Sequence, residues 1–373
     1  MAGKKRAPRP RAARKLGILT AGGDCPGLNA VIRAVVRSAS DQGMSVVGFK
    51  DGYRGLVLNQ TLELDSDRVS SILTLGGTIL GSSNRDDPFR FIEDFSAPTA
   101  PQDRHKDCLL HLGQHGVDAL VVLGGDGSMA VAHKLERKGV RVVGVPKTID
   151  NDLRGTERCF GHDTAVGIAA DAIDRLHTTA SSHHRVIVVE LMGREAGWLS
   201  LRAGLASGAD AILIPEIACS AEAVAGMIAR RRAKGRAATI VVVAEGARPN
   251  NKASVRQIVK GSPEPVRLGG VGEVLAKELE RLSGVESRSV VLGHVVRGGT
   301  PSASDRIFAT ALGVQAVRLL MAGGGGCMVT HVGGGYSSVP LAEVAGKVRL
   351  VPREHPLILT ARAMGVEFGD TKR

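Results

Sequence analysis

The chain has 373 residues, of which 43% are hydrophobic, enough for two domains with separate cores. The net charge of +12 first suggests a nucleic-acid partner, but the opening fifteen residues hold seven Lys and Arg and no acid, which leaves +5 for the rest. With two Tyr, one Trp and seven Phe, the chain lacks the aromatic side chains that stack on bases, which argues against a nucleic-acid-binding protein.

The first predicted element is a basic tail. Residues 1–14 are rich in Ala, Pro and Arg and have no apolar periodicity, which predicts a disordered segment and no signal peptide. Five scattered cysteines without CxxC pairs or zinc-ligand spacing favour a reduced cytoplasm. No apolar run approaches the roughly 18 residues of a membrane span. We therefore expect a cytoplasmic protein with no membrane partner.

Short runs rich in Val and Ile alternate with helix-length amphipathic segments along the chain. Strands are predicted over 16–20, 119–125, 140–146, 185–190, 211–215, 238–246 and 288–294. Helices are predicted over 30–40, 164–180 and 271–283, and an irregular surface loop over 247–268. Near-continuous apolar strands separated by helices are typical of parallel sheets covered on both faces. The predicted fold is α/β, with two doubly wound, mostly parallel sheets, whose ligands bind beyond the carboxyl ends of the strands.

Glycine-rich loops follow two of the predicted strands. AGGDCPGLNA (21–30) places two glycines and an Asp before a helix, where free N–H groups favour an anion, although a plain tight turn is an alternative. In GGDGS (124–128), glycines permit close approach to a phosphate, and Asp126 is suited to hold Mg²⁺. The alternative interpretation of Asp126 is a helix cap.

The segment VVGVPKTIDND (142–152) passes from buried apolar residues to a polar turn. Two acids one residue apart can merely cap a turn, and a lone lysine is usually solvated. Beside a loop for Mg²⁺ and phosphate, the acids instead suggest a general base and a carboxylate that orients it.

Cations gather after several other strands, together with one acid. The candidates are Arg185, Arg194, Arg288, His294 and Arg297, with Glu245 after 238–244. A single arginine is usually part of a surface ion pair, and Met192 fits a core equally well. Together, however, arginine forks for a phosphate and a carboxylate for hydroxyls indicate a pocket for a phosphorylated polyol.

The combined motifs resemble the 6-phosphofructokinase family. In family order they are GGDCPGLN, GGTILG (76–81), GGDGS, PKTIDND (146–152), SSHHR (181–185), MGR (192–194), AEG (244–246) and VLGHVVRGG (291–299), and they cover about residues 15–350. The match is specific, because lipid and NAD kinases that share GGDG lack PKTIDND and MGR. The resemblance implies phosphoryl transfer to the 1-hydroxyl of fructose 6-phosphate in glycolysis, with Mg²⁺ as cofactor.

The resemblance also implies roles for individual residues. The nucleotide site would comprise Gly23, Arg85, Gly125, Asp126, Gly127 and Ser128, with Asp126 on Mg²⁺. The segment GSSNRDDPF (81–89) carries one residue more than the bacterial pattern GSAR. The position of Arg85 is therefore offset by one residue from the arginine of that pattern. Asp150 would be the base, with Thr148 and Asp152 beside it and Lys147 near the donor phosphate, while Arg194 would stabilise the transferred group.

The sugar-phosphate contacts implied within one subunit are Thr148, Ile149, Asp150, Met192, Gly193, Arg194, Glu245, His294 and Arg297. Arg185 and Arg288 would reach in from a neighbouring subunit of a homotetramer or dimer. The implied domains are discontinuous: 15–161 plus 296–345 for the nucleotide and 162–295 plus 346–373 for the sugar phosphate, with the active site in the cleft between them. A catalytically silent regulatory subunit is a rival, but it would be expected to lack Asp126 or Asp150.

Two residues bear on the phosphoryl donor. Gly127 resembles the family's ATP users, whereas pyrophosphate users typically carry Asp there, in the space of the α-phosphate. Lys147 resembles pyrophosphate users, but the combination of both is similar to that of actinobacterial and plant ATP-dependent members. Because steric exclusion outweighs a flexible cation, we expect ATP, with a pyrophosphate-dependent phosphotransferase as the alternative. Tagatose 6-phosphate and sedoheptulose 7-phosphate remain alternative acceptors.

Overall fold

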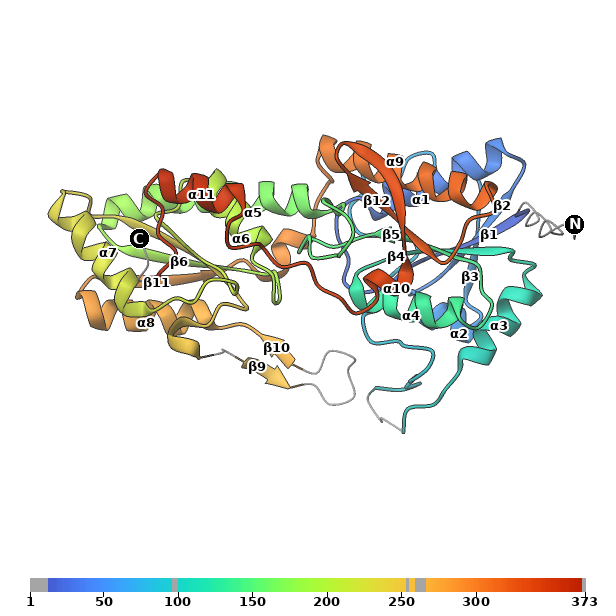
Figure 1. The fold of residues 1–373 in the computed structure, drawn as a ribbon, viewed down its shortest axis with the longest axis horizontal. Coiled ribbons are helices and arrows are strands. Elements are labelled where there is room, and N and C mark those ends of the chain that lie inside the picture. The colour runs from blue at the N-terminus through green and yellow to red at the C-terminus, as the bar shows by residue number, and fades with distance from the viewer. Residues whose placement is uncertain (1–12, 96–99, 253–254, 259–265, 371–373) are drawn as a thin grey trace, which may run out of the picture. The chain divides into compact units, whose positions relative to one another are not determined.

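The computed structural model describes residues 13–95, 100–252, 255–258 and 266–370 (Figure 1). The chain forms two compact units, with unit 1 comprising 1–147, 154–158 and 306–347 and unit 2 comprising 148–153, 159–305 and 348–373. Most of the predicted tail, residues 1–12, lies outside the described residues. Its last two residues are held, because Ala13 is buried and the Arg14 N–H donates to the Asp118 carboxylate over 2.6 Å.

Unit 1 is built on a seven-stranded sheet in the order β13-β12-β5-β4-β1-β2-β3. Its strands are β1 (Lys15–Thr20), β2 (Ser45–Phe49), β3 (Thr61–Leu64), β4 (Ala119–Gly124), β5 (Val142–Pro146), β12 (Cys327–Val332) and β13 (Gly335–Pro340). The five inner strands are parallel, and β3 and β13 pair antiparallel at the two edges. The parallel strands therefore direct the loops after β1, β4 and β5 to one edge of the sheet.

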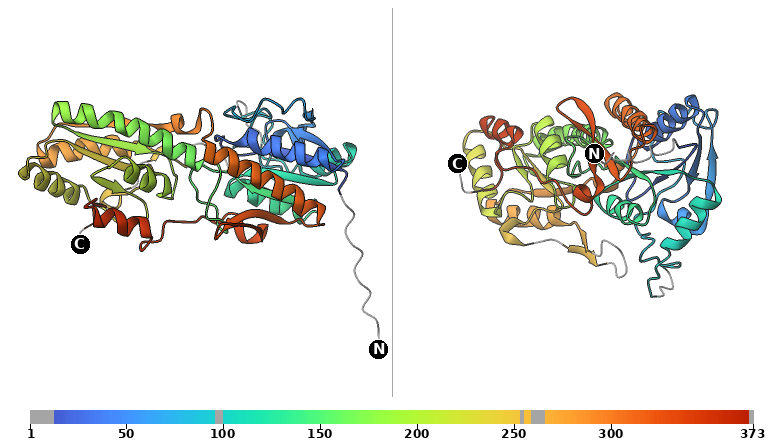
Figure 2. Two further views of the ribbon diagram at one scale, coloured as in Figure 1. Left: turned by 90° about the horizontal axis from the view of Figure 1, so that it is seen from above. Right: turned by 45° about the vertical axis from the view of Figure 1, so that its right-hand side comes forward.

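Helices cover both faces of this sheet (Figures 1 and 2). One face carries α1 (Leu28–Asp41) and α9 (Ala303–Met321), and the other carries α2 (Tyr53–Leu58), α3 (His105–Gln114), α4 (Asp126–Glu136) and α10 (Leu341–Val344). The two helices on the first face pack closely at Gly313, where a Cβ atom would lie 2.8 Å from that of Ala34. A glycine is thus needed for the close approach of α9 to α1.

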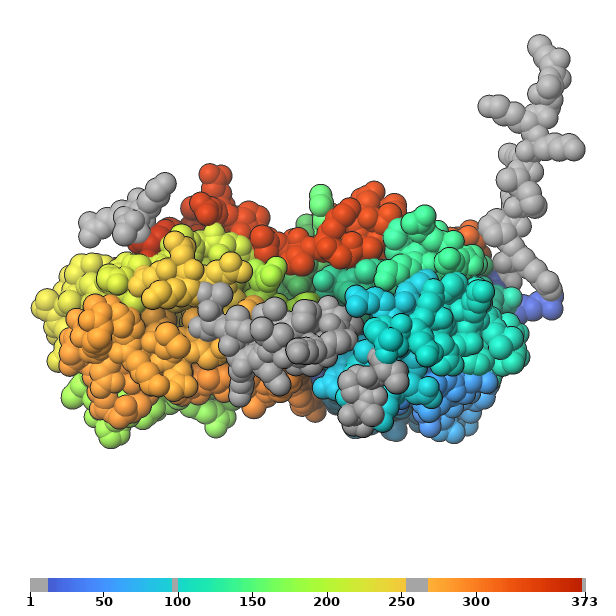
Figure 3. All heavy atoms as spheres, turned by 90° about the horizontal axis from the view of Figure 1, so that it is seen from below, coloured from blue at the N-terminus to red at the C-terminus, as the bar shows by residue number. Residues whose placement is uncertain are grey.

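Unit 2 contains a four-stranded parallel sheet in the order β11-β6-β8-β7. The strands are β6 (Val186–Leu191), β7 (Ala211–Leu213), β8 (Thr239–Ala244) and β11 (Ser287–Val291). Helices α5 (His162–His183), α6 (Trp198–Ala206) and α11 (Pro356–Ala363) lie on one face, and α7 (Ala221–Ala233) and α8 (Val271–Ser283) on the other. In Figure 3, α7 (yellow) and α8 (orange) form the outer surface of the second face. Their apolar sides enclose a core with β6 and β8.

The predicted fold class is confirmed: both units are α/β with parallel-dominated sheets. Every predicted strand matches an observed one, and the predicted helices correspond to α1, α5 and α8. The loop predicted over 247–268 is wrong in part, because it contains a 3₁₀ turn (Pro249–Asn251) and the antiparallel pair β9 (Val255–Ile258) and β10 (Val266–Leu268). The sequence does not predict this short two-stranded pair because it lacks a long apolar run. Residues 253–254 and 259–265 of the predicted loop lie outside the described residues.

All five cysteines are free thiols, and burial raises the pKa of the Cys108 and Cys159 thiols to about 12. Within the described part of the chain, no helix combines the length and the apolar character needed to cross a bilayer.

Candidate active site

The loop after β1 is held by a segment that lies about sixty residues further along the chain. The Gly22 N–H donates to the Ser83 carbonyl over 2.9 Å, and the Ser82 hydroxyl donates to the Gly22 carbonyl over 2.6 Å. Gly22 has a φ of 83°, a left-handed conformation that favours glycine. The sequence GGTILGSS therefore braces the loop GGDCPG of unit 1.

The loop after β4 leads directly into α4. Gly125 precedes this helix and Asp126 is its first residue, so the N–H groups of its first turn have no partner within the helix. A Cβ atom at Gly124 would lie 2.2 Å from that of Ser128, which requires glycine there. A Cβ atom at Gly127, in contrast, would meet nothing within 4 Å. The loop thus combines tight packing at its base with open space over the start of α4.

Tyr53 supports this helix start in a way that sequence reasoning missed. Its hydroxyl donates to the Ser128 carbonyl over 2.7 Å, and its ring is buried. Burial first, and the nearby Asp87 second, raise the pKa of the Tyr53 phenol well above its ordinary value, so it stays a donor.

Lys147 joins the two glycine-rich loops. Its side chain is only 3% exposed, and its ammonium donates to the Gly23 carbonyl over 2.5 Å. A Cβ atom built on Gly22 would lie 3.2 Å from this ammonium nitrogen and 3.3 Å from the Ser128 hydroxyl. Unit 1 therefore brings together three residues from separate motifs, Gly23, Ser128 and Lys147.

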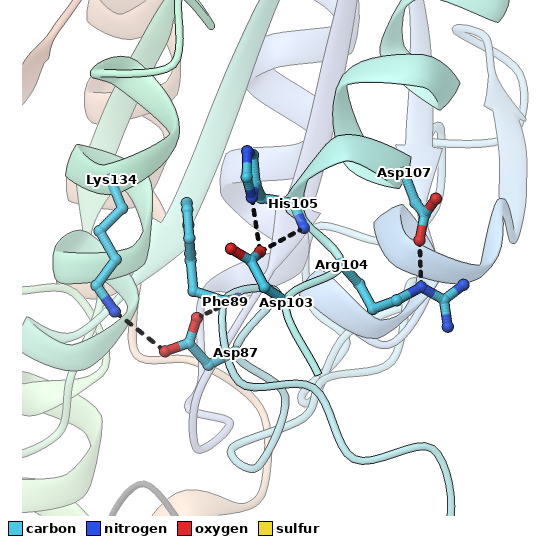
Figure 4. A network of polar contacts seen from close by, with 7 residues as sticks. All are labelled: Asp87, Phe89, Asp103, Arg104, His105, Asp107 and Lys134. Atoms are coloured by element: carbon cyan, nitrogen blue, oxygen red, sulfur yellow. Dashed lines mark hydrogen bonds and ion pairs between the residues drawn. The ribbon is translucent and has the colours of Figure 1, made fainter. Parts of the chain in front are cut away.

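Arg85 lies on an exposed part of the segment that follows the brace, with its guanidinium 5.5 Å from the centre of the Phe95 ring. The continuation of this segment is fixed by a polar network that ties it to α3 and α4 (Figure 4). Lys134 of α4 pairs with Asp87 at 3.2 Å, and the His105 ring at the start of α3 stacks on Phe89 at 5.1 Å. The further members are Asp103, which accepts from His105, and the ion pair Arg104–Asp107.

The residues of unit 1 fit a Mg²⁺ ion that arrives with a phosphate ligand. Among the described residues, no group of three or more His, Cys, Asp or Glu is placed to hold a metal by itself. Asp126 supplies one carboxylate beside the N–H groups of the first turn of α4. Magnesium usually takes one or two protein carboxylates and completes its shell with phosphate oxygens and water.

The polar turn of PKTIDND opens unit 2, where the chain leaves unit 1 after Lys147. Thr148, Asp150 and Asp152 are all buried, and the Thr148 hydroxyl oxygen accepts from the Asp150 N–H over 3.0 Å. Asn151 adopts a left-handed φ of 54°, and its side-chain oxygen accepts from the Cys159 N–H over 2.9 Å. The turn is therefore a fixed structure rather than a solvated loop.

His162, at the start of α5, supports the same turn. Its Nδ1 lies 2.6 Å from the carbonyl oxygen of Ile149. Burial is the main cause that lowers the pKa of His162 to about 3, with smaller contributions from Arg202 and Arg349. The ring is thus neutral at physiological pH, and its Nδ1–H donates to Ile149.

The loop after β6 is organised by Glu245, which follows β8. The Glu245 carboxylate accepts from the N–H groups of Gly193 and Arg194 over 3.2 and 2.9 Å. Arg194 has a left-handed φ of 54°, and half-buried Met192 precedes this bend. Burial raises the pKa of Glu245, the bond from Arg194 opposes this, and Asp150 adds to the rise. Asp150 and Glu245 are therefore electrostatically coupled in unit 2.

The predicted cations occupy two different ends of the unit 2 sheet. Arg194 follows β6, and His294 and Arg297 lie in the 3₁₀ turn Gly293–Arg297 after β11, all at the carboxyl ends of strands. Arg185 and Arg288 lie where β6 and β11 begin, and both contact Glu286, at 3.7 and 2.7 Å. Since a strand advances about 3.3 Å per residue, most of the length of β6 or β11 separates these two arginines from the first group.

Glu190 is another residue that sequence reasoning missed. Its buried carboxylate accepts from the N–H groups of Gly270 and Gly272 over 2.9 and 2.8 Å, at the start of α8. Its carbonyl accepts from Leu292 over 3.1 Å, just before the turn with His294. A buried acid within an otherwise apolar strand was the available signal.

The chain is a two-unit α/β protein of the doubly wound class, in which ligands bind beyond the carboxyl ends of the strands. A family model described as phosphofructokinase matches residues 15–320, and the chain belongs to this family.

The names of the curated relatives include two different phosphoryl donors, ATP and pyrophosphate. An ATP-dependent 6-phosphofructokinase 2 of Clostridium perfringens is 49% identical over 96% of this chain and 99% of its own. A pyrophosphate–fructose 6-phosphate 1-phosphotransferase of Amycolatopsis methanolica is 50% identical over 91% of this chain and 97% of its own. Among solved structures, phosphofructokinase from Saccharomyces cerevisiae matches 88% of this chain with a TM-score of 0.76 and 31% identity. The match spans 45% of that longer chain.

Proposed function

We propose that this protein is an ATP-dependent 6-phosphofructokinase, a transferase that phosphorylates the 1-hydroxyl of fructose 6-phosphate in the committed step of glycolysis. Membership of the family supports the reaction, since relatives named for it match nearly the full chain. The observation that carries the choice of ATP is the open space at Gly127, which leaves room for an α-phosphate. The presence of both Asp126 and Asp150 argues against a silent regulatory subunit.

Unit 1 is proposed to bind the nucleotide. Gly23, Gly125 and Ser128 would bind phosphates through the backbone and hydroxyl groups around the α4 N-terminus. Asp126 would hold Mg²⁺, which neutralises charge on the phosphates when bound. Lys147 is placed among these loops by its bond to Gly23, so its ammonium would lie beside the donor phosphates. Arg85 is proposed as an outer contact of the nucleotide.

Unit 2 is proposed to bind fructose 6-phosphate and to supply the base. Asp150 would accept the proton of the 1-hydroxyl, while Thr148 and Asp152 hold its turn. Arg194 would stabilise the transferred phosphoryl group. Further sugar-phosphate contacts are proposed for Ile149, Met192, Gly193, Glu245, His294 and Arg297. The cationic His294 and Arg297 and the carboxylate of Glu245 suit the phosphate and the hydroxyls of a phosphorylated sugar, and tagatose 6-phosphate and sedoheptulose 7-phosphate are candidate additional acceptors.

Arg185 and Arg288 are proposed to act on the site of a neighbouring subunit in a homotetramer or dimer. Their position at the amino ends of β6 and β11 supports this proposal, because the contacts proposed within one subunit follow carboxyl ends. We also place the enzyme in the cytoplasm, where five free thiols are kept reduced.

The alternative is a pyrophosphate-dependent fructose 6-phosphate 1-phosphotransferase. Lys147 favours it, and some relatives bear that name at comparable identity. The test is an assay of the purified enzyme with fructose 6-phosphate, Mg²⁺ and either ATP or pyrophosphate at matched concentrations. Faster turnover with ATP supports the proposal, and substantially faster turnover with pyrophosphate would select the alternative.

A further inference from the structure

We propose that Arg349 is a positioning residue, which orients the base Asp150 by holding the two residues that follow it. This inference rests on the proposed function, because it assigns Arg349 to the same reaction. Arg349 lies outside all the motifs that identify the family, almost two hundred residues after the turn that it contacts.

Arg349 contacts the turn through both its backbone and its side chain. Its Nη2 donates to the Asn151 carbonyl over 2.6 Å, and its N–H donates to the Asp152 carbonyl over 2.6 Å. Next to these bonds, Val348 forms an antiparallel bridge with Leu153. Residues 348–349 are therefore paired with residues 151–153 of the turn.

The turn needs such support because Asn151 is left-handed, with a φ of 54°. This conformation is uncommon for residues with a side chain, and Asn, which tolerates it better than most, keeps it where its surroundings hold it. The bond from Arg349 to the Asn151 carbonyl fixes the peptide that follows this left-handed residue. On the other side, His162 holds Ile149. Asp150 thus lies between two peptides that are held by side chains from distant parts of the chain.

Arg349 is itself held by the single tryptophan of the chain. Its guanidinium carbon lies 4.2 Å from the centre of a Trp198 ring, a cation–π contact. The indole N–H donates to the Arg349 carbonyl over 2.8 Å, and the ring is almost fully buried. Since Trp198 begins α6, a rigid element determines where the guanidinium lies.

Two further contacts fix the residues after Arg349. The Glu216 carboxylate accepts from the N–H groups of Val351 and Gly197, each over 2.9 Å, and so joins the segment to the residue before α6. The His355 ring meets the Trp198 ring edge-on at 5.0 Å. We call residues 348–355 the C-terminal strap.

Steady-state kinetics of Arg349 variants test the proposal. Arg349→Met keeps a stem of similar bulk but removes the cation and its donors, and it should lower kcat by about 10- to 100-fold, the effect of displacing a reacting group by about 1 Å. The KM values for fructose 6-phosphate and ATP should change little, since His162 still holds Ile149 and the further proposed sugar-phosphate contacts lie outside the turn. Arg349→Lys should recover part of kcat, because it keeps a charge but not the planar fork. Arg175→Met, which removes an exposed arginine of α5, is the matched control and should match wild type.

Fluorescence supplies a readout that is independent of activity. Because Trp198 is the single tryptophan, Arg349→Met should change the emission spectrum of the substrate-free protein, and Arg175→Met should not. An unchanged spectrum would contradict the contact between the guanidinium and the indole on which the proposal rests.

The outcomes separate the two proposals. Wild-type enzyme that cannot phosphorylate fructose 6-phosphate with either donor overturns the proposed function and the role of Arg349 with it. Active wild type together with near-normal kcat in Arg349→Met, or a rise in KM alone, overturns only the role of Arg349. If Arg349→Met does not fold, Arg349→Lys decides: a several-fold loss of kcat at unchanged KM supports the proposal, and full kcat refutes it.

Discussion

The ammonium group of Lys147 donates a 2.5 Å hydrogen bond to the Gly23 carbonyl and so joins the end of β5 to the loop after β1. Lys147 is therefore a structural member of the proposed donor site as well as a positive charge. Its removal deletes this buried bond, while Ser82 and Ser83 continue to hold the loop after β1.

For Lys147→Gly we expect a moderate effect on the ATP reaction. The N–H groups of α4 and the proposed Mg²⁺ still bind phosphates, so kcat/KM for ATP should fall by about 10-fold, the effect of one charge-assisted hydrogen bond worth ~1.5 kcal/mol. The measurement is kcat/KM with each donor. A loss of ATP activity as complete as that of Gly127→Asp would contradict this ranking.

For Gly127→Asp we expect loss of most ATP-dependent activity with normal folding. The position is open and lies in the first turn of a helix, where an acid is favourable, so thermal stability should not fall. Repulsion between the new carboxylate and the α-phosphate should cost several kcal/mol, or about 10²-fold or more in kcat/KM for ATP. Gly127→Ala separates bulk from charge and should be much milder. ATP kinetics close to wild type in Gly127→Asp would refute the proposed position of the nucleotide.

For Asp150→Asn we expect kcat to fall by roughly 10²–10⁴, the usual contribution of a general base. The amide has nearly the same shape, so the bond between the Asp150 N–H and the Thr148 hydroxyl should persist. The apparent KM for ATP should change little, because the proposed nucleotide contacts belong to unit 1. Turnover near the wild-type level would exclude Asp150 as the base.

For a shared active site we expect complementation between inactive variants. Arg185→Ala and Asp150→Ser chains, mixed under conditions of proven subunit exchange, should regain activity if Arg185 serves a neighbouring site. Each variant mixed with itself is the control. Lack of recovery despite exchange would indicate that every chain completes its own site.

For His162 we expect a defined pH dependence of stability. The pKa of His162 is about 3 in the folded protein against an ordinary value of 6.5, mainly because of burial. Below pH 6.5 the unfolded chain therefore takes up a proton that the folded protein does not, and stability falls as the pH drops from 6.5 toward 3. Between pH 7.5 and 5.5 this contributes a loss of about 1.4 kcal/mol.

The variant His162→Gln tests this dependence by urea unfolding at the two pH values. It cannot titrate, so its loss of stability between pH 7.5 and 5.5 should be smaller than that of wild type by about 1.4 kcal/mol. His183→Gln, at the exposed end of the same helix, is the control. Equal pH dependence in His162→Gln and wild type would contradict a neutral, buried His162.

Local patterns in the sequence determined much of the fold and named most candidate site residues. Apolar runs such as 119–125 and 185–190 predict parallel strands because burial on both faces demands continuous Val and Ile, and both are strands here. Glycines at 22 and 124 mark loops that leave no room for a side chain or need a left-handed φ. The short β9–β10 pair has no such pattern and was missed.

The tertiary structure alone decided which residues support the candidate site. Lys147 meets Gly23, Glu190 meets Gly270, and Arg349 meets Asn151, each across at least eighty residues of chain. In each pair the side chain bonds a backbone N–H or carbonyl group. Nearly every residue offers these groups, so the sequence does not indicate which of them is bound. Parallel strands must be joined by crossover helices, and this topology brings distant loops together. The periodicity of a segment reports the face that it buries, but not the distant segment that it meets.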